Sequence, residues 1–233
     1  MYDTYQIGTG PIHIAFIGGI HGGYEWNTIV LAYEILDYLI DHPEQVPDSI
    51  SLYIIPSANP DGQAAVVGHV GRFYPDEVST ETIHGRFNGN GVDLNRNWDC
   101  EWSPTGFWRQ QPVSAGYEPF SEIETRILKD FLTDPKMDAV VFWHSAVPGI
   151  FPGGCSQPFS QANSLGQAYA QAAPYHFFDD FTSYQVTGDA SDWLALQDIP
   201  AISVELNNHT DIDWDQNLSG VIAVLNLLDS QLR

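Results

Sequence analysis

The chain has 233 residues, of which 43% are hydrophobic, and this size and composition suit one large globular domain with a substantial core. Its 30 acidic residues against 8 basic ones give a formal net charge of -22, and such a surface would repel phosphate backbones and anionic lipid headgroups. We therefore expect no nucleic-acid partner and no membrane partner. Cationic partners fit this charge, and so does a chain whose acidity only maintains solubility in salty surroundings.

Short apolar runs bounded by Gly, Pro, Asn or His alternate with segments of helical periodicity. In chain order they predict a strand at 12–17, a helix at 29–40, a strand at 52–55, a helix at 120–132, a strand at 139–142, a helix at 164–172, a strand at 201–204 and a helix at 221–228. This alternation predicts an α/β fold in a single domain over residues 1–233. We expect a mixed, mostly parallel twisted sheet flanked by helices on both faces.

Polar residues follow each predicted strand at the point where it ends. His21 follows the first strand, "SANPDG" the second and His144 the third, and Glu205 ends the fourth. Ligands of open α/β sheets bind at the carboxyl ends of the strands. These polar groups are therefore predicted to meet at one edge of the sheet.

The stretch "GGIHGGYEWNT" (18–28) places His21 and Glu25 around two glycines where a strand gives way to a helix. Glycines there allow a sharp bend and the close approach of an ion or substrate. With His144, these residues form a three-ligand zinc set that leaves a fourth position for water, and Glu205 could accept the water's proton. An ordinary tight turn and hydrogen-bonded loop histidines remain open alternatives.

The segment 63–100 is rich in Gly, Asn and Asp, is weakly periodic and is longer than a passive connector. Long irregular segments of this kind usually carry function. Within it, "RFNGNGVDLNRNWD" contains Asn95 next to Arg96, whose planar guanidinium could bind a carboxylate. The alternative is a structural ion pair of Arg96 with a nearby acid such as Asp93.

Seven pieces of the sequence occur in the order found in the zinc carboxypeptidases of the carboxypeptidase A type. They are the His21–Glu25 pair with "NPDG", "GVDLNRNWD", "PFSE", "WHS", "SYQVTGDASDW" and "SVEL". The chain resembles this family, specifically a short bacterial-type member, from about Ile12 to Leu206. The resemblance implies a zinc metallocarboxypeptidase with one Zn2+ per chain that acts on peptides with a free C-terminal carboxylate.

The resemblance also implies a role for each matched residue. His21, Glu25 and His144 resemble the zinc ligands, Glu205 the general base, and Arg86 the residue that stabilises the oxyanion. Asn95 and Arg96 resemble the clamp for the terminal carboxylate, and Tyr184 the tyrosine that closes over the substrate.

Two features of "HGGYE" depart from the family pattern. Three residues separate His21 from Glu25, where the family usually has two, and Gly22 and Gly23 can absorb the extra one. Tyr24 replaces an arginine of the pancreatic-type members, so substrate contacts beyond the scissile bond are expected to differ.

Specificity in the family depends largely on residues just before "DW", here "TGDASDW". Ser191 resembles the base of the side-chain pocket, and Asp189 lies two residues earlier. We expect this pair to favour lysine, arginine or the amine of diaminopimelate. A murein peptide amidase or an N-acyl amino acid deacylase with the same zinc centre is the alternative enzyme, and a non-catalytic binding domain is the alternative outside enzymes.

Cys100 follows "NRNWD" directly, and Cys155 lies on a glycine-containing loop beyond His144. Both segments should approach the same sheet edge, so a disulfide there would fit an oxidising compartment, and two free thiols are the alternative. We expect a secreted or extracytoplasmic protein whose signal is absent from this chain. Serine hydrolase chemistry is disfavoured because no Gly-x-Ser-x-Gly elbow occurs.

Overall fold

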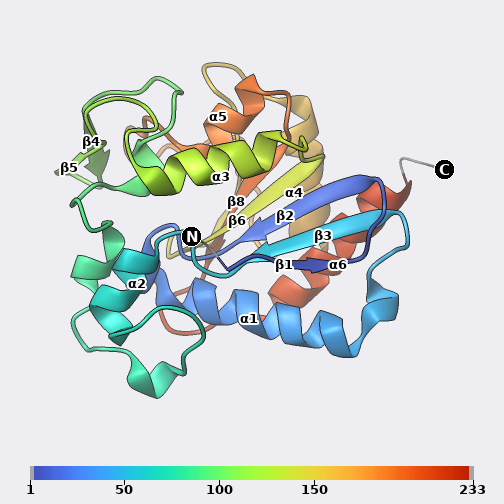
Figure 1. The fold of residues 1–233 in the computed structure, drawn as a ribbon. Helices are drawn as coiled ribbons and strands as arrows, with labels where there is room; N and C mark the ends of the chain where they lie inside the picture. The colour runs from blue at the N-terminus through green and yellow to red at the C-terminus, as the bar shows by residue number, and fades with distance from the viewer. Residues whose placement is uncertain (1–2, 231–233) are drawn as a thin grey trace.

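The computed structural model describes residues 3–230 and is built around a six-stranded sheet in the order β1-β3-β2-β6-β8-β7 (Figure 1). Its strands are β1 (Tyr5–Ile7), β2 (Ile12–Ile17), β3 (Ile50–Ile55), β6 (Ala139–Ser145), β7 (Gly149–Pro152) and β8 (Ala201–Leu206). The four inner strands run parallel, and the edge strands β1 and β7 run antiparallel to their neighbours. The predicted mixed, mostly parallel sheet is confirmed.

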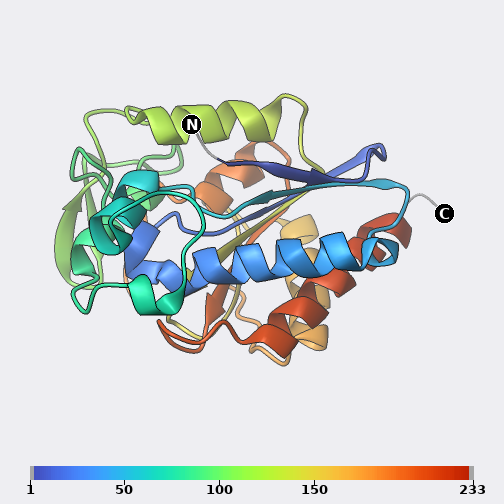
Figure 2. The same cartoon turned by 60° about the horizontal axis from the view of Figure 1, so that its bottom comes forward.

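Helices cover both faces of this sheet (Figures 1 and 2). The helices are α1 (Trp26–Asp41), α2 (Pro60–Val67), α3 (Ile123–Thr133), α4 (Ser160–Ala172), α5 (Ala190–Leu196) and α6 (Trp214–Ser230). α1, α4 and α6 pack on one face, and α3 and α5 pack on the other. No helix among the described residues is both long and apolar enough to cross a bilayer.

β2 shows why its sequence reads as one continuous apolar run. Ile14 and Phe16 belong to the core under α1, α4 and α6, whereas Ala15 and Ile17 belong to the core under α3 and α5. All four side chains are buried. Successive side chains of a strand point to opposite faces, so a strand buried on both faces loses the polar alternation of a surface strand.

The four predicted strands and four predicted helices all exist, and most extend beyond their predicted ends. The prediction missed the edge strands β1 and β7, the short helices α2 and α5, and a separate hairpin of β4 (Thr105–Trp108) and β5 (Gln111–Ser114). The prediction of an irregular segment over 63–100 is wrong at its start, because residues 63–67 form the end of α2. The remainder contains only short 3-10 turns.

Cys100 and Cys155 form a disulfide, which decides between the two alternatives left open by the sequence. The bond links the end of the long irregular segment to the loop after β7. Both cysteine-bearing segments contribute residues to the wall of one cavity at the carboxyl edge of the sheet. The disulfide therefore holds together two parts of that cavity wall.

Candidate active site

The carboxyl ends of three neighbouring strands bring the candidate residues together. His144 lies near the end of β6, and Glu205 lies directly opposite it in the register of β8. His21 follows β2, the neighbour of β6 on its other side. The predicted convergence at one sheet edge is confirmed for these three strands, whereas Asn59 of "SANPDG" caps α2 and donates to the carbonyl oxygen of Arg86.

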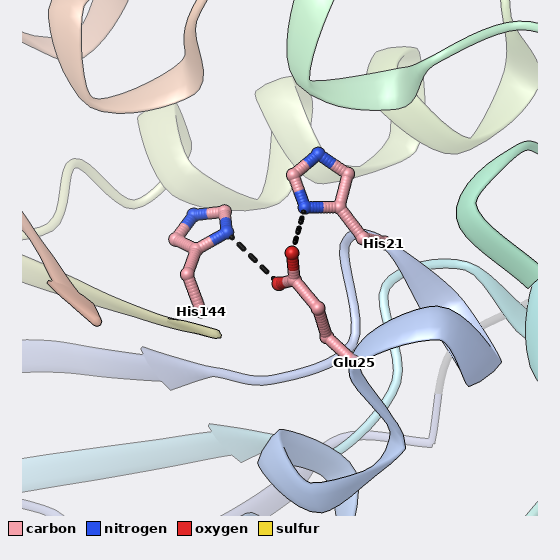
Figure 3. Close-up of side chains that lie close together, drawn as sticks. All are labelled: His21, Glu25 and His144. Atoms are coloured by element: carbon pink, nitrogen blue, oxygen red, sulfur yellow. Dashed lines mark hydrogen bonds and ion pairs between the residues drawn. The ribbon is translucent and has the colours of Figure 1, made fainter. Parts of the chain in front are cut away.

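Glu25 lies between the two histidine rings (Figure 3). Its Oε1 is 2.8 Å from Nδ1 of His21, and its Oε2 is 3.2 Å from Nδ1 of His144. One ligand atom from each residue lies within 4.8 Å of the others, and all three residues are buried. Two imidazole nitrogens and one carboxylate form a donor set that zinc accepts, with a coordination position left for water.

The two glycines of "HGGYE" make this approach possible. Gly22 has φ of +45°, and a Cβ on it would lie 2.6 Å from the carbonyl oxygen of Gly85. A Cβ on Gly23 would lie 2.4 Å from the Cβ of Val66. The backbone from Gly22 to Glu25 forms one 3-10 turn pressed against neighbouring segments, and this turn accommodates the extra residue between His21 and Glu25.

Asp93 connects two of the predicted site residues, a role that the sequence analysis did not assign. Its Oδ1 is 3.2 Å from Nε2 of His21, although the contact lacks the alignment of a hydrogen bond. Its Oδ2 accepts hydrogen bonds from Nε and Nη2 of Arg86, at 3.0 Å and 2.7 Å. The alternative that paired Asp93 with Arg96 is therefore wrong, because Asp93 pairs with Arg86.

Buried charges at this site shift one another's pKa values. Burial opposes the ionisation of Glu25 and of Asp93, but the neighbouring cationic groups outweigh it and hold both pKa values well below their ordinary range. Burial would lower the pKa of His144, yet its hydrogen bond to Glu25 outweighs burial and raises the pKa. An ionised carboxylate is the form that ligates a metal, so Glu25 is in its ligating form.

Glu205 differs from the other carboxylates. Burial raises the pKa of its carboxyl group to about 7, against the opposing charge of His144. Its Oε2 accepts one hydrogen bond, from the backbone nitrogen of Val147 at 3.0 Å. A carboxyl group with a pKa near neutrality can take up a proton and release it again at that pH.

All ten residues singled out from the sequence line one of two adjoining cavities, which share His21, Tyr184 and Glu205. The first cavity has a volume of about 400 Å³. Asn95 and Arg96 line it, and Arg96 donates from Nε to the carbonyl of Phe107 and from Nη1 to that of Asn95. Its Nη2 makes no hydrogen bond within residues 3–230.

Asp189 and Ser191 also line the first cavity, and they begin α5. Asp189 Oδ1 accepts from the backbone nitrogens of Ser191 and Asp192 and from the Ser191 hydroxyl. Its Oδ2 accepts from Nδ2 of Asn95 at 2.7 Å. Asp189 thus caps the helix and orients Asn95, and the capping role was not predicted because α5 itself was missed.

The second cavity, of about 270 Å³, adjoins the first at His21, Tyr184 and Glu205. Glu25 and Arg86 line it, and so does Tyr24, which the resemblance had connected with substrate contacts. Trp108, Arg109 and His209 also line it and were not assigned to the site from the sequence. Trp108 and Arg109 come from the tip of the β4–β5 hairpin. Trp108 and Arg109 reach the site only because the hairpin packs against it. No local sequence pattern encodes that contact, so no signal in the sequence indicated either residue.

Comparison with known proteins places this chain in a family. Residues 8–213 match the family model for zinc carboxypeptidase. A carboxypeptidase B from Astacus astacus is 32% identical over 124 residues, which cover 50% of this chain and 39% of that protein. The chain thus spans less than two thirds of the length of this relative.

Solved structures share the fold at lower identity. Murein-tripeptide amidase MpaA from Escherichia coli O157 has a TM-score of 0.65 at 20% identity, covering 97% of this chain and 91% of that one. Bovine thrombin-activatable fibrinolysis inhibitor, in complex with tick carboxypeptidase inhibitor, has a TM-score of 0.74 at 16% identity, covering 99% and 91%. At these identities the likeness establishes the fold alone.

Proposed function

The chain belongs to the zinc carboxypeptidase family of hydrolases that act on peptide bonds, and from this premise we propose that it is a zinc-dependent metallocarboxypeptidase that removes C-terminal residues from peptides. The convergence of His21, Glu25 and His144 within 4.8 Å carries the proposal. These three residues would hold one Zn2+ per chain. Asp93, next to Nε2 of His21, would orient that imidazole.

Zinc bound by these residues would lower the pKa of water and polarise the scissile carbonyl. Glu205 accepts a proton from the attacking water and passes it to the leaving amine, a role suited to a carboxyl group whose pKa burial raises to about 7. Glu205 would ionise more readily beside the positive charge of a metal. Arg86, fixed by Asp93, stabilises the negative charge that develops on the carbonyl oxygen.

The first cavity receives the C-terminal residue. Asn95 and Arg96 bind its carboxylate, with Nη2 of Arg96 as the guanidinium nitrogen that is not already engaged by the protein. Tyr184, from the loop before α5, covers the bound residue. A residue anchored in this way has its peptide bond directed toward His21 and Glu205, because the two cavities meet at these residues.

The side chain of the C-terminal residue meets an acidic pocket. Ser191 and Asp189 line it together with Glu101, Asp179 and Asp180. We expect this wall to favour lysine, arginine or the amine of diaminopimelate through its negative charge, and Asp189 also to keep Asn95 in place. Equal cleavage of C-terminal Phe and Lys substrates by the wild type would overturn this preference.

Murein peptide amidase is the second candidate, because diaminopimelate offers the acidic pocket an amine. An N-acyl amino acid deacylase would use the same carboxylate clamp on a shorter substrate. A panel of blocked dipeptides and muropeptides separates the three activities. The Cys100–Cys155 disulfide suits an oxidising compartment, so we propose a secreted or extracytoplasmic location.

The test combines metal content with hydrolysis. Protein purified without chelator or added metal should contain about one zinc per chain by elemental analysis, as expected for a single three-ligand site. It should also hydrolyse N-benzoylglycyl-lysine, whereas Glu25→Ala should lose both the zinc and the activity, with circular dichroism as the control for folding. A folded wild type that binds no zinc would overturn the proposal in favour of a non-catalytic binding domain.

A further inference from the structure

The second cavity lies on the amino side of the proposed scissile bond. It shares His21, Tyr184 and Glu205 with the first cavity but contains neither Asn95 nor Arg96. If the terminal carboxylate binds at Asn95 and Arg96, the rest of the peptide would extend past His21 and Glu205 into the second cavity, which adjoins the first there. A role for this cavity in substrate binding therefore rests on the proposed function.

The β4–β5 hairpin forms the outer wall of this cavity through Trp108, which packs on two residues of the site. The guanidinium carbon of Arg86 lies 4.8 Å from the centre of the Trp108 ring, and Tyr24 meets that ring edge-on at 5.2 Å between centres. Cation–π and edge-to-face contacts of this kind hold an aromatic residue in one orientation. The hairpin tip is thus fixed over the site.

Arg109 follows Trp108 at the turn and lines the same cavity. Its side chain is exposed and makes neither an ion pair nor a side-chain hydrogen bond within residues 3–230. By contrast, two other arginines among the described residues form ion pairs: Arg72 with Asp37, and Arg86 with Asp93. Arg109 therefore lies, without an acidic partner among these residues, in the cavity that the proposed substrate would enter.

Arg109 is the exposed cationic side chain of this cavity, because the other arginine that lines it, Arg86, is buried and is proposed to act on the carbonyl oxygen. Two nitrogens of Arg86 already donate to Asp93. The Ser145 hydroxyl donates its proton to Asn27. Nδ1 of His209, 3.0 Å from the same hydroxyl, must therefore donate to it, and this nitrogen is already engaged by the protein. Glu25 and Glu205, on the inner wall, would repel an anion that entered deeply. An anionic group is therefore favoured at the outer wall, beside Arg109.

We propose that Arg109 is a specificity-determining residue that binds a carboxylate on the substrate residue at the amino side of the scissile bond. The guanidinium fork matches the two oxygens of a carboxylate. With the acidic pocket on the other side, the preferred substrate carries a negative charge before the cleaved bond and a positive charge after it. The side chain of an α-linked glutamate and the free α-carboxylate of a γ-linked one both supply the negative charge.

Two peptides test the proposal because they differ in one charge: N-acetyl-Ala-Glu-Lys and N-acetyl-Ala-Gln-Lys. The zinc-loaded wild type should hydrolyse the Glu peptide with a kcat/KM roughly fivefold higher, as expected for an exposed ion pair. This ratio should fall to near one in Arg109→Gln and below one in Arg109→Glu. It should also shrink in the wild type as salt screens the pair.

Arg126→Gln is the matched control, because it removes one exposed positive charge from α3, outside both cavities. Its Glu-to-Gln ratio should equal that of the wild type. Binding of both peptides to Glu205→Gln, with and without Arg109→Gln, gives a readout independent of turnover, and the Glu peptide should lose its advantage only when Arg109 is replaced.

The outcomes separate the two proposals. A wild type that hydrolyses both peptides equally, or a preference that survives Arg109→Gln, overturns the role of Arg109 and leaves the carboxypeptidase function in place. A zinc-loaded wild type that hydrolyses neither these peptides nor N-benzoylglycyl-lysine overturns the proposed function, and the role of Arg109 falls with it.

Discussion

Asp93 holds Arg86 through a single carboxylate oxygen, Oδ2, which accepts hydrogen bonds from both Nε and Nη2. This arrangement leaves the other oxygen, Oδ1, facing Nε2 of His21 at 3.2 Å. One buried carboxylate thereby sets the position of a proposed zinc ligand and of the residue proposed to stabilise the oxyanion. The two functions are coupled through one side chain.

Replacement of this carboxylate should weaken both functions at once. We expect Asp93→Asn to lower zinc affinity and kcat/KM by about 10- to 100-fold each, as is typical of groups that orient metal ligands. Competition with a chromogenic chelator measures the affinity, and peptide hydrolysis at saturating zinc measures the residual activity. Unchanged zinc affinity in a folded variant would mean that Asp93 does not orient His21.

Glu205 is proposed to move a proton and not to ligate the metal. Glu205→Gln keeps an oxygen that can accept from Val147 but removes the basic group. We expect it to retain about one zinc per chain and to lose about 1,000-fold in kcat, within the range of general acid–base catalysis. Elemental analysis of the same preparation is the control. Activity within tenfold of the wild type would contradict the role.

The strand-end residues were predictable because strand periodicity and the carboxyl-edge rule are local properties of the sequence. The positions of His144 and Glu205 could be predicted from the two strands that carry them, and these strands are neighbours in the sheet. Roles that depend on distant partners were not predictable. Asp93 acts on His21, 72 positions earlier in the chain, and Arg109 reaches the site only because Trp108 packs on Arg86.

Asp189 shows a second limit of sequence reasoning. The resemblance drew attention to its place in the specificity pocket, and the structure does place it on the cavity wall. The same carboxylate also caps α5 and holds Asn95. The capping role was not predicted because α5 itself was not recognised in the sequence. One carboxylate can therefore serve both the cavity wall and a helix end, and a resemblance to a family indicates only the first of these roles.

The disulfide should contribute to stability by restricting the unfolded chain. Cys100 and Cys155 are separated by 55 positions, and closure of a loop of that length corresponds to about 4 kcal/mol. We expect the double variant Cys100→Ser/Cys155→Ser to lose stability of this order in urea unfolding. Reductant should destabilise the wild type and leave the double variant unchanged. Equal effects of reductant on both proteins would show that the bond does not stabilise the fold.

Asp192 should make the protein less stable as pH rises toward neutrality. Burial, followed by the charge of Asp189, raises the pKa of the Asp192 carboxyl group from its usual 3.8 to about 7, and Gly154 donates a backbone hydrogen bond to its Oδ1. The unfolded chain releases this proton near pH 4, whereas the folded chain keeps it until about pH 7. Stability conferred by this group is therefore lost between these two values and is constant above them.

Asp192→Asn should remove that dependence while keeping an oxygen that can accept from Gly154. At pH 4 we expect the free energies of unfolding of the variant and the wild type to be nearly equal. At pH 8 that of the variant should be higher by at most about 4 kcal/mol, the equivalent of the full pKa shift. Urea unfolding of both proteins, freed of metal by a chelator because histidine ligands release zinc at low pH, measures the difference at pH 4, 6 and 8. Asp198→Asn, an exposed position beyond α5 with a left-handed φ of 53° that Asn also tolerates, controls for the loss of one surface charge. A stability difference for Asp192→Asn that is constant across this pH range would show that the folded protein does not retain the proton of Asp192.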